Sequence, residues 1–280
     1  MHIAPQDNHN QPVIGADNDI TPLTYLNIVK LKQGETFASQ VTGYETCIVP
    51  ATGSVDITVG DERFAAIGTR TVNVWDSEPE GVYVPTGDQA TITCVSGQTE
   101  VFVAGARYDE VLAPFAVRAK DIDMVQYGSD DTKTHRKIKH ILGNRYHDKV
   151  GRLLVSELYT VGQGGWSGFP PHKHDTDRLP QETRHNEIYN FRFKPNHGFG
   201  IQLLQQEGDE VGEAFHLVDG STFAFSSGYH PCVVAPGYEM YYFTILGGES
   251  QRSLVQSFQS EHAYQVETIP GIKNMIEKFK

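Results

Sequence analysis

Short strand-forming segments recur along this chain at roughly the 8–12-residue spacing of antiparallel β-sandwiches and barrels. They include "YETCIVPA", "ATITCV" and "TEVFVAG" in the first half, and "GRLLVSELYTV", "EIYNFRF" and "MYYFTILG" in the second. Gly, Pro, Asp and Asn lie between them, as turns require. Helix signals are few, and the clearest is "NMIEKFK" near the C-terminus. The pattern predicts an all-β protein.

A loose internal repeat divides the strand segments into two groups. "GVYVPTGDQATITC" and "TFAFSSGYHPCVVA" both place a strand, a glycine-containing turn and a second apolar strand in the same order. We therefore expect two related barrels in tandem, over residues 20–118 and 150–265. A charged connector is expected at 119–149, and a short helix within 266–280. Because no histidine lies between His9 and His135, a site built from histidines belongs to the second barrel.

Charge and cysteine usage limit the possible partners. The 35 acidic and 23 basic residues give a net charge of −12 at pH 7, which repels nucleic acid and anionic membranes, so neither is an expected partner. Cys47, Cys94 and Cys232 form no CxxC pair, and we expect buried thiols in a reducing compartment. Residues 1–20 lack the pattern of a secretion signal, and no apolar run approaches the about 18 residues that span a bilayer. We expect a soluble, cytoplasmic protein.

The segment "PPHKHDTDRLPQETRHNEIYNF", residues 170–191, concentrates histidines and carboxylates. Residues i and i+2 of a strand share a face, so His172 and His174 can both point into one barrel. Glu187 begins a strand whose same face is otherwise aromatic, where a carboxylate is costly unless it is paired. His230 lies in a turn that leads into an apolar strand. Three imidazoles and one carboxylate suit a divalent ion such as Zn, Mn, Fe, Co or Ni.

The same residues also have an interpretation without a metal. An HxH pair is more often at a surface or hydrogen-bonded than metal-binding, and His230 is equally consistent with a simple turn residue. Glu187 has Arg184 and Arg192 as possible salt-bridge partners, and Glu182 is a rival carboxylate in a loop-like segment. Residue chemistry alone leaves these alternatives open.

Longer motifs carry a family resemblance. "GGWSGFPPHKHDTDRLPQE", "NEIYNFRF", "HGFGIQL" and "SSGYHPCVVAPGYEMYYFTILGG" resemble the 5-deoxy-glucuronate isomerases of inositol catabolism, which are related to the 4-deoxy-5-hexosulose-uronate ketol-isomerases. The resemblance extends more weakly through the first half. It implies a bicupin, with two tandem antiparallel cupin barrels, and it assigns metal binding to His172, His174, Glu187 and His230. Where the family usually reads "GFGFQRVYT" this chain reads "GFGIQLLQQ", so Leu203 replaces an arginine suited to hold a carboxylate.

The resemblance implies an aldose–ketose isomerase that acts on an acidic sugar. A divalent ion polarises the carbonyl, and either a base carries the proton from C2 to C1 or a hydride shifts directly. The catalytic candidates are Asp175, Glu182, Tyr238 and Tyr242, with Tyr229, Tyr241 and His262 as further possible bases. The candidates for substrate binding are Lys173, Arg184, Arg192, Tyr229 and Arg252. Strand alternation points Lys173 and Arg192 away from the ligand face.

Several functions remain to be separated. The substrate is expected to be of the 5-deoxy-glucuronate type, or a related sugar such as a hexuronate or a 6-sulfo-hexose. A cupin dioxygenase is the alternative from another class, because the same ligands can activate O₂ on Fe(II) or Ni(II). A non-catalytic sugar sensor is the third. Tandem barrels expose sheet edges that commonly pair, so we expect a homo-oligomer.

Overall fold

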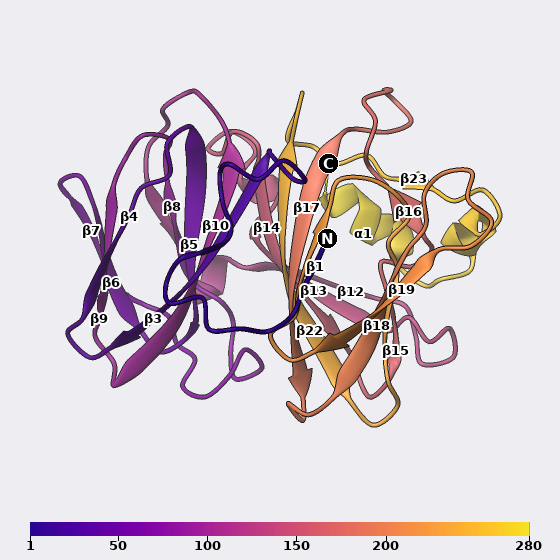
Figure 1. Ribbon diagram of the computed structural model, residues 1–280, viewed down its shortest axis with the longest axis horizontal. Coiled ribbons are helices and arrows are strands. Elements are labelled where there is room, and N and C mark those ends of the chain that lie inside the picture. The colour runs from indigo at the N-terminus through magenta and orange to yellow at the C-terminus, as the bar shows by residue number, and fades with distance from the viewer. Residues whose placement is uncertain (280) are drawn as a thin grey trace.

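The computed structural model describes residues 1–279, which form two β-barrels packed side by side (Figure 1). The N-terminal half, in indigo and purple, makes up one barrel, and the orange and yellow segments belong to the other. All pairings between the named strands are antiparallel, as in β5 with β10 and β17 with β22. The prediction of an all-β fold with two tandem antiparallel barrels is confirmed.

The first barrel is built from a six-stranded and a four-stranded sheet. The larger sheet has the order β11-β8-β5-β10-β3-β2, with β2 Pro12–Ile14, β3 Thr24–Lys32, β5 Tyr44–Thr52, β8 Gly81–Val84, β10 Gln98–Arg107 and β11 Phe115–Val117. The smaller has the order β4-β9-β6-β7, with β4 Thr36–Ser39, β6 Val55–Val59, β7 Glu62–Ile67 and β9 Ala90–Cys94. Aliphatic side chains such as Val29, Ile57 and Val103 fill the space between them.

The second barrel is built around a seven-stranded sheet with the order β1-β20-β17-β22-β14-β13-β12. Its strands are β1 His2–Ile3, β12 Asp123–Tyr127, β13 Arg136–Leu142, β14 Leu153–Thr160, β17 His185–Lys194, β20 Thr222–Phe225 and β22 Glu239–Gly248. A four-stranded sheet, β15-β21-β18-β19, consists of β15 Gly165–Ser167, β21 Cys232–Val234, β18 Phe199–Leu204 and β19 Glu213–Val218. A two-stranded sheet pairs β16 His172–Lys173 with β23 Ser257–Phe258.

Helices are short and few. Within residues 1–279, three 3₁₀ helices, η1 Ala119–Asp121, η2 Asn144–Tyr146 and η3 Ala263–Glu267, precede a single α-helix, α1 Ile272–Lys278. Ile272 and Met275 of α1 are buried in the apolar core of the second barrel. No helix within residues 1–279 is long and apolar enough to cross a membrane.

The two larger sheets pack against each other and form the core between the barrels. Val101 and Val103 of β10 belong to the core of the first barrel, whereas Phe102 belongs to the core between the sheets. The Phe102 ring stacks on Phe243 of β22, with 4.5 Å between ring centroids. Because both faces of β10 are buried, its sequence is an almost continuous apolar run rather than an alternating one.

Two buried carboxylates bind across the boundary between the barrels. Glu45 of the first barrel accepts hydrogen bonds from the backbone N–H groups of Gly151 and Leu153, at 2.8 and 2.7 Å. In the other direction, Glu157 of the second barrel accepts two hydrogen bonds from the Arg70 guanidinium, at 2.7 and 2.6 Å. These contacts fix the position of one barrel against the other.

The predicted connector at 119–149 is wrong, because it contains two strands of the second barrel. β13 pairs with β14 and with β12, which is the edge strand of the seven-stranded sheet. Edge strands tolerate many charges, and this charge density made the segment resemble a linker. β1 also departs from the expected division, since it lies at the start of the chain yet pairs with β20 of the second barrel.

Candidate metal centre

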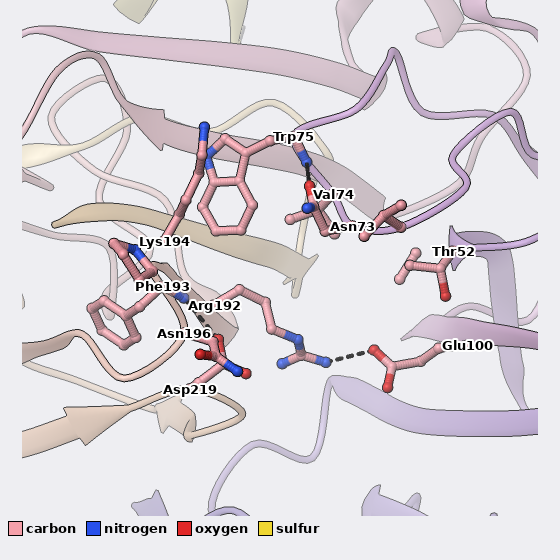
Figure 2. Close-up of a pocket in the computed structure, with 13 residues that line it drawn as sticks. Thr52, Asn73, Val74, Trp75, Glu100, Arg192, Phe193, Lys194, Asn196 and Asp219 are labelled. Carbon is pink, nitrogen blue, oxygen red and sulfur yellow. Dashed lines mark hydrogen bonds and ion pairs between the residues drawn. The ribbon is translucent and has the colours of Figure 1, made fainter.

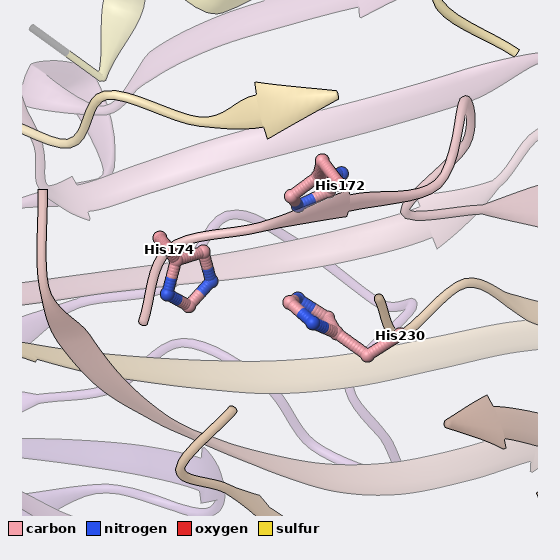
Figure 3. Close-up of side chains that lie close together, drawn as sticks. All are labelled: His172, His174 and His230. Carbon is pink, nitrogen blue, oxygen red and sulfur yellow. The ribbon is translucent and has the colours of Figure 1, made fainter. Parts of the chain in front are cut away.

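Three histidines from two segments meet inside the second barrel (Figure 3). His172 lies on β16, His174 directly follows that strand, and His230 lies in the turn before β21. One ring nitrogen from each lies within 4.8 Å of the others, and all three side chains are buried. The structure therefore brings together the three imidazoles that the sequence placed in one site.

Backbone carbonyls orient all three rings. A neutral imidazole whose Nδ1–H donates to a carbonyl presents the lone pair of Nε2 on its opposite side, which is the usual arrangement of a metal-binding histidine. The contacts from Nδ1 are His172 to Pro170 O at 3.3 Å, His174 to His185 O at 3.2 Å and His230 to Gly228 O at 2.8 Å.

Glu187 supplies the carboxylate of the site from the start of β17. Its Oε2 lies 3.1 Å from Nε2 of His174 and 3.2 Å from Nε2 of His230, while Oε1 accepts a hydrogen bond from Thr244 at 2.7 Å. Burial alone would raise the pKa of Glu187, but the His174 and His230 rings that face its oxygens outweigh burial and hold the pKa well below the usual range. The carboxylate is therefore charged and faces the histidines.

These four side chains fit a divalent ion in their chemistry. Burial and the neighbouring imidazoles lower the pKa of His172 to about 3, so its ring is neutral. Nε2 of His230 is buried and has no hydrogen-bond partner of good geometry, apart from the approach to Glu187. A neutral ring at His172 and a charged carboxylate at Glu187 are protonation states that suit metal binding, whereas burial at His174 is outweighed by Glu187, which raises the pKa of His174, so that a metal would compete with a proton there.

A cavity lies beside three of the four candidate ligands, His172, His174 and Glu187, and its empty space of about 410 Å³ includes the solvent at its opening. The Nε2 atom of His172 is 2.9 Å from the side-chain amide of Gln256, which also lines the cavity. Met275 and Phe279, in and just after α1, form part of its wall. The other polar lining residues are Tyr127, Tyr189, Tyr242 and Thr244, and the other apolar ones are Ile138, Leu158, Leu246 and Leu254. None of the described lining residues is a lysine or arginine.

Two residues beside the ligands were missed by sequence reasoning. Thr244 shares the inward face of β22 with Tyr242 and Leu246, so strand alternation contained a usable signal. Gln256 comes just before β23, in a segment without clear periodicity. Only the tertiary pairing of β23 with β16 brings it to His172.

The acidic catalytic candidates Asp175 and Glu182 are instead engaged in an ion cluster around Lys173. The buried Lys173 ammonium lies 2.6 Å from Asp175 and 3.1 Å from Glu182. Burial would raise the pKa of Asp175, but the Gly228 N–H and Lys173 lower it to about 2. Glu182 also accepts the backbone N–H groups of Asp175 and Thr176. The cluster holds the loop that follows the ligand strand, so neither carboxylate is a free base and Lys173 is not available to substrate.

The three arginines proposed for substrate binding also lie away from the cavity. Arg192 points into the groove between the barrels and pairs with Glu100 at 2.7 Å (Figure 2). Arg184 pairs with Glu249 at 3.4 Å on the surface. The buried Arg252 donates to three backbone carbonyls, those of Leu142, Gly143 and Leu153. Each guanidinium is used in a structural contact.

Among the tyrosine candidates, only Tyr242 lines the metal-site cavity. Tyr238 packs near His197 and directly precedes β22. That end of β22 pairs with Lys194, at the opposite end of β17 from Glu187. The hydroxyl of Tyr241 donates to Glu157 between the barrels. Tyr229 and His262 line a separate groove with Leu203. Tyr242 itself has its hydroxyl 2.5 Å from Ser167 Oγ, and burial raises its pKa well above the usual value.

We expect Thr244→Val to weaken metal binding by about 10- to 100-fold, the typical effect of losing a hydrogen bond that orients a ligand. The substitution keeps the side-chain shape but removes the 2.7 Å hydrogen bond to Glu187. Titration of the metal-free protein against a chelator of known affinity measures the change. Thr222→Val, on β20 of the same sheet and bonded to Asn190 rather than to a ligand, is the matched control. Equal affinities for the Thr244 variant and the wild type would contradict the role of Thr244.

Comparisons with known proteins extend over nearly the whole chain. The profile of the KduI/IolB family matches residues 2–265. A "5-deoxy-glucuronate isomerase" from Shouchella clausii (strain KSM-K16) is 33% identical over 233 residues, covering 81% of this chain and 83% of that protein. One of the same name from Bacillus velezensis (strain DSM 23117 / BGSC 10A6 / LMG 26770 / FZB42) is 31% identical, with 86% of each chain covered.

Solved structures share the fold. An IolB-like protein from Salmonella typhimurium LT2 superposes with a TM-score of 0.78 at 24% identity, covering 94% of each chain. A variant of oxalate decarboxylase from Bacillus subtilis superposes with a TM-score of 0.62 at 10% identity, covering 95% of this chain and 83% of that one. At these identities the superpositions bear on the fold alone.

Proposed function

This chain belongs to the KduI/IolB family and is a sugar isomerase, and on that premise we propose that it is a metal-dependent aldose–ketose isomerase of the 5-deoxy-glucuronate type. The observation that carries the metal dependence is the convergence of three imidazole nitrogens and the Glu187 carboxylate beside a cavity. The names of the relatives support the substrate type.

The residues around the cavity define what the chain contributes to isomerisation. A bound divalent ion would supply a Lewis acid that polarises a sugar carbonyl. His172, His174, Glu187 and His230 would hold it. Burial raises the pKa of Tyr189 and Tyr242 well above the usual value, so both keep their protons and serve as hydrogen-bond donors rather than bases. The wall formed by Met275 and Phe279 would keep water from the reacting carbons.

The test is proton NMR of the metal-loaded protein in D₂O under nitrogen. The panel consists of 5-deoxy-glucuronate, glucuronate and 6-deoxy-6-sulfoglucose. We expect 5-deoxy-glucuronate to convert to its ketose without oxygen, and deuterium at C1 would identify proton transfer rather than a hydride shift. Conversion of another panel member alone would reassign the substrate. Consumption of a sugar only in air would replace the isomerase by a dioxygenase.

A further inference from the structure

Arg136 is a buried cation with unused hydrogen-bond donors. It lies at the start of β13, is 1% exposed, and is among the largest fully buried side chains of the described chain. Its Nη1 donates to the carbonyl of Trp166 at 3.2 Å, but Nε and Nη2 are buried and have no hydrogen-bond partner. Among residues 1–279, no carboxylate lies within 4 Å of the guanidinium.

An arrangement of this kind is costly to the fold. Arginine keeps its charge in proteins, and a buried charge without a partner is among the most destabilising features that a core can contain. Other buried cations of this chain are fully paired: Arg70 binds Glu157, Lys173 binds Asp175 and Glu182, and Arg252 binds three carbonyls. Arg136 is therefore an exception that calls for a ligand.

The position of Arg136 connects it to the cavity beside the candidate metal ligands. Ile138 lines that cavity, and Arg136 precedes it by two residues on the same face of β13, a distance of about 6.6 Å along a strand. Tyr127, its partner across the sheet, also lines the cavity. The guanidinium lies 5.7 Å from the ring centroid of Tyr242, a third lining residue.

Arg136 and the candidate metal ligands lie beside the same group of cavity residues. Tyr242 pairs with Phe191, which lies four residues along β17 from the candidate ligand Glu187. Glu187, His172 and His174 line the cavity, and Arg136, which does not line it, lies beside Tyr127 and Tyr242, which do. An open-chain sugar whose carbonyl end is held at the metal would extend toward the tyrosines with its far end.

We propose that Arg136 binds the acid group of the substrate and so determines the preference for a sugar acid over a neutral sugar. The inference rests on the proposed function, because it assumes that the cavity holds a sugar. Nε and Nη2 lie along one edge of the guanidinium, and this edge binds a carboxylate through two parallel hydrogen bonds. Arg136 would then hold the carboxylate from β13, whereas Leu203 lines a separate groove.

Calorimetric titration of the metal-loaded protein with L-gulonate tests the subsite. L-gulonate is glucuronate with its aldehyde reduced to an alcohol, so it cannot isomerise, and sorbitol is its neutral counterpart. We expect Arg136→Met to weaken L-gulonate binding by about 100-fold, which is about 2.8 kcal/mol at 1.4 kcal/mol per factor of ten. Sorbitol binding should not change. Arg192→Met, which removes a guanidinium already paired with Glu100, should leave the affinity for both ligands unchanged.

The melting temperature of the ligand-free protein separates binding from a structural role. If Arg136 is retained for an anion, Arg136→Met removes an unpaired buried charge and should melt at the same temperature as the wild type or higher. Arg136→Lys keeps the charge but loses the two-point contact, and should bind L-gulonate at least about tenfold more weakly. Unchanged L-gulonate affinity in both variants, with a lower melting temperature for Arg136→Met, would overturn the proposal.

The two proposals fail in different ways. If Arg136→Met converts 5-deoxy-glucuronate with the KM of the wild type, the anion subsite is wrong and the isomerase stands. If wild-type protein binds L-gulonate through Arg136 but converts no sugar of the panel, the subsite stands and the isomerase is wrong.

Discussion

His174→Ala should lose its bound metal and with it the isomerisation, with kcat/KM falling by at least about 1000-fold, or about 4 kcal/mol at 1.36 kcal/mol per factor of ten. The variant removes one of three converging nitrogens and also the imidazole that lies 3.1 Å from Glu187. A carboxylate that loses this partner stays buried and binds a proton more readily, which competes with a metal. Elemental analysis of the purified variant and an NMR assay of conversion measure the two losses together.

The control for this experiment is a histidine of the same barrel outside the site. His197→Ala removes an exposed ring that contacts Tyr238, so it should keep about one metal ion per chain and full activity. A His174→Ala protein that lost its metal yet isomerised the sugar at the wild-type rate would show that the ion has no part in the reaction.

Arg70→Met should reduce the free energy of unfolding by about 3–5 kcal/mol, the cost of leaving one member of a buried ion pair alone. The Arg70 and Glu157 side chains are 1% and 0% exposed, and they make two short hydrogen bonds across the boundary between the barrels. Burial opposes ionisation of Glu157, but the guanidinium outweighs it and lowers the pKa of the carboxyl. Urea unfolding followed by circular dichroism measures the loss.

Two further variants test the cause of that loss. Replacing both partners, as Arg70→Met with Glu157→Gln, leaves no unpaired charge and should recover part of the stability. Arg63→Met breaks an exposed pair with Asp56 on the same barrel and should change little. If Arg70→Met were no more destabilising than Arg63→Met, the buried pair would not be the contact that fixes the barrels.

Strand alternation and turn residues were sufficient to predict the all-β class and to place His172 and His174 on one face, because these signals are local, whereas His230 was joined to them by the family resemblance. They failed where local signals conflict. The segment "RKIKHIL" alternates as a strand should, with Arg136 and Ile138 on one face, but its charge density suggested a connector. Only the pairing of β13 with β14 shows that an arginine can lie on the inner face of such a strand.

The roles of charged side chains depend on distant partners and could not be predicted. Lys173 was expected to face away from the ligands and to reach substrate, but Glu182 and Glu207 surround its ammonium. Arg252 is 67 residues beyond His185 in the sequence, yet its backbone carbonyl oxygen lies 3.2 Å from Nε2 of the His185 ring. No spacing rule links such residues, because the contacts arise only when β16, β17 and β23 come together in one barrel.

Diffraction from crystals of the purified protein, collected at the absorption edge of the metal found by elemental analysis, tests the central claim most directly. The account predicts one anomalous peak per chain in the second barrel, at about 2.0–2.3 Å from Nε2 of His172, His174 and His230 and from an oxygen of Glu187. Crystals of fully active protein that show no peak at these four side chains, or a metal bound elsewhere, would contradict the proposed metal centre.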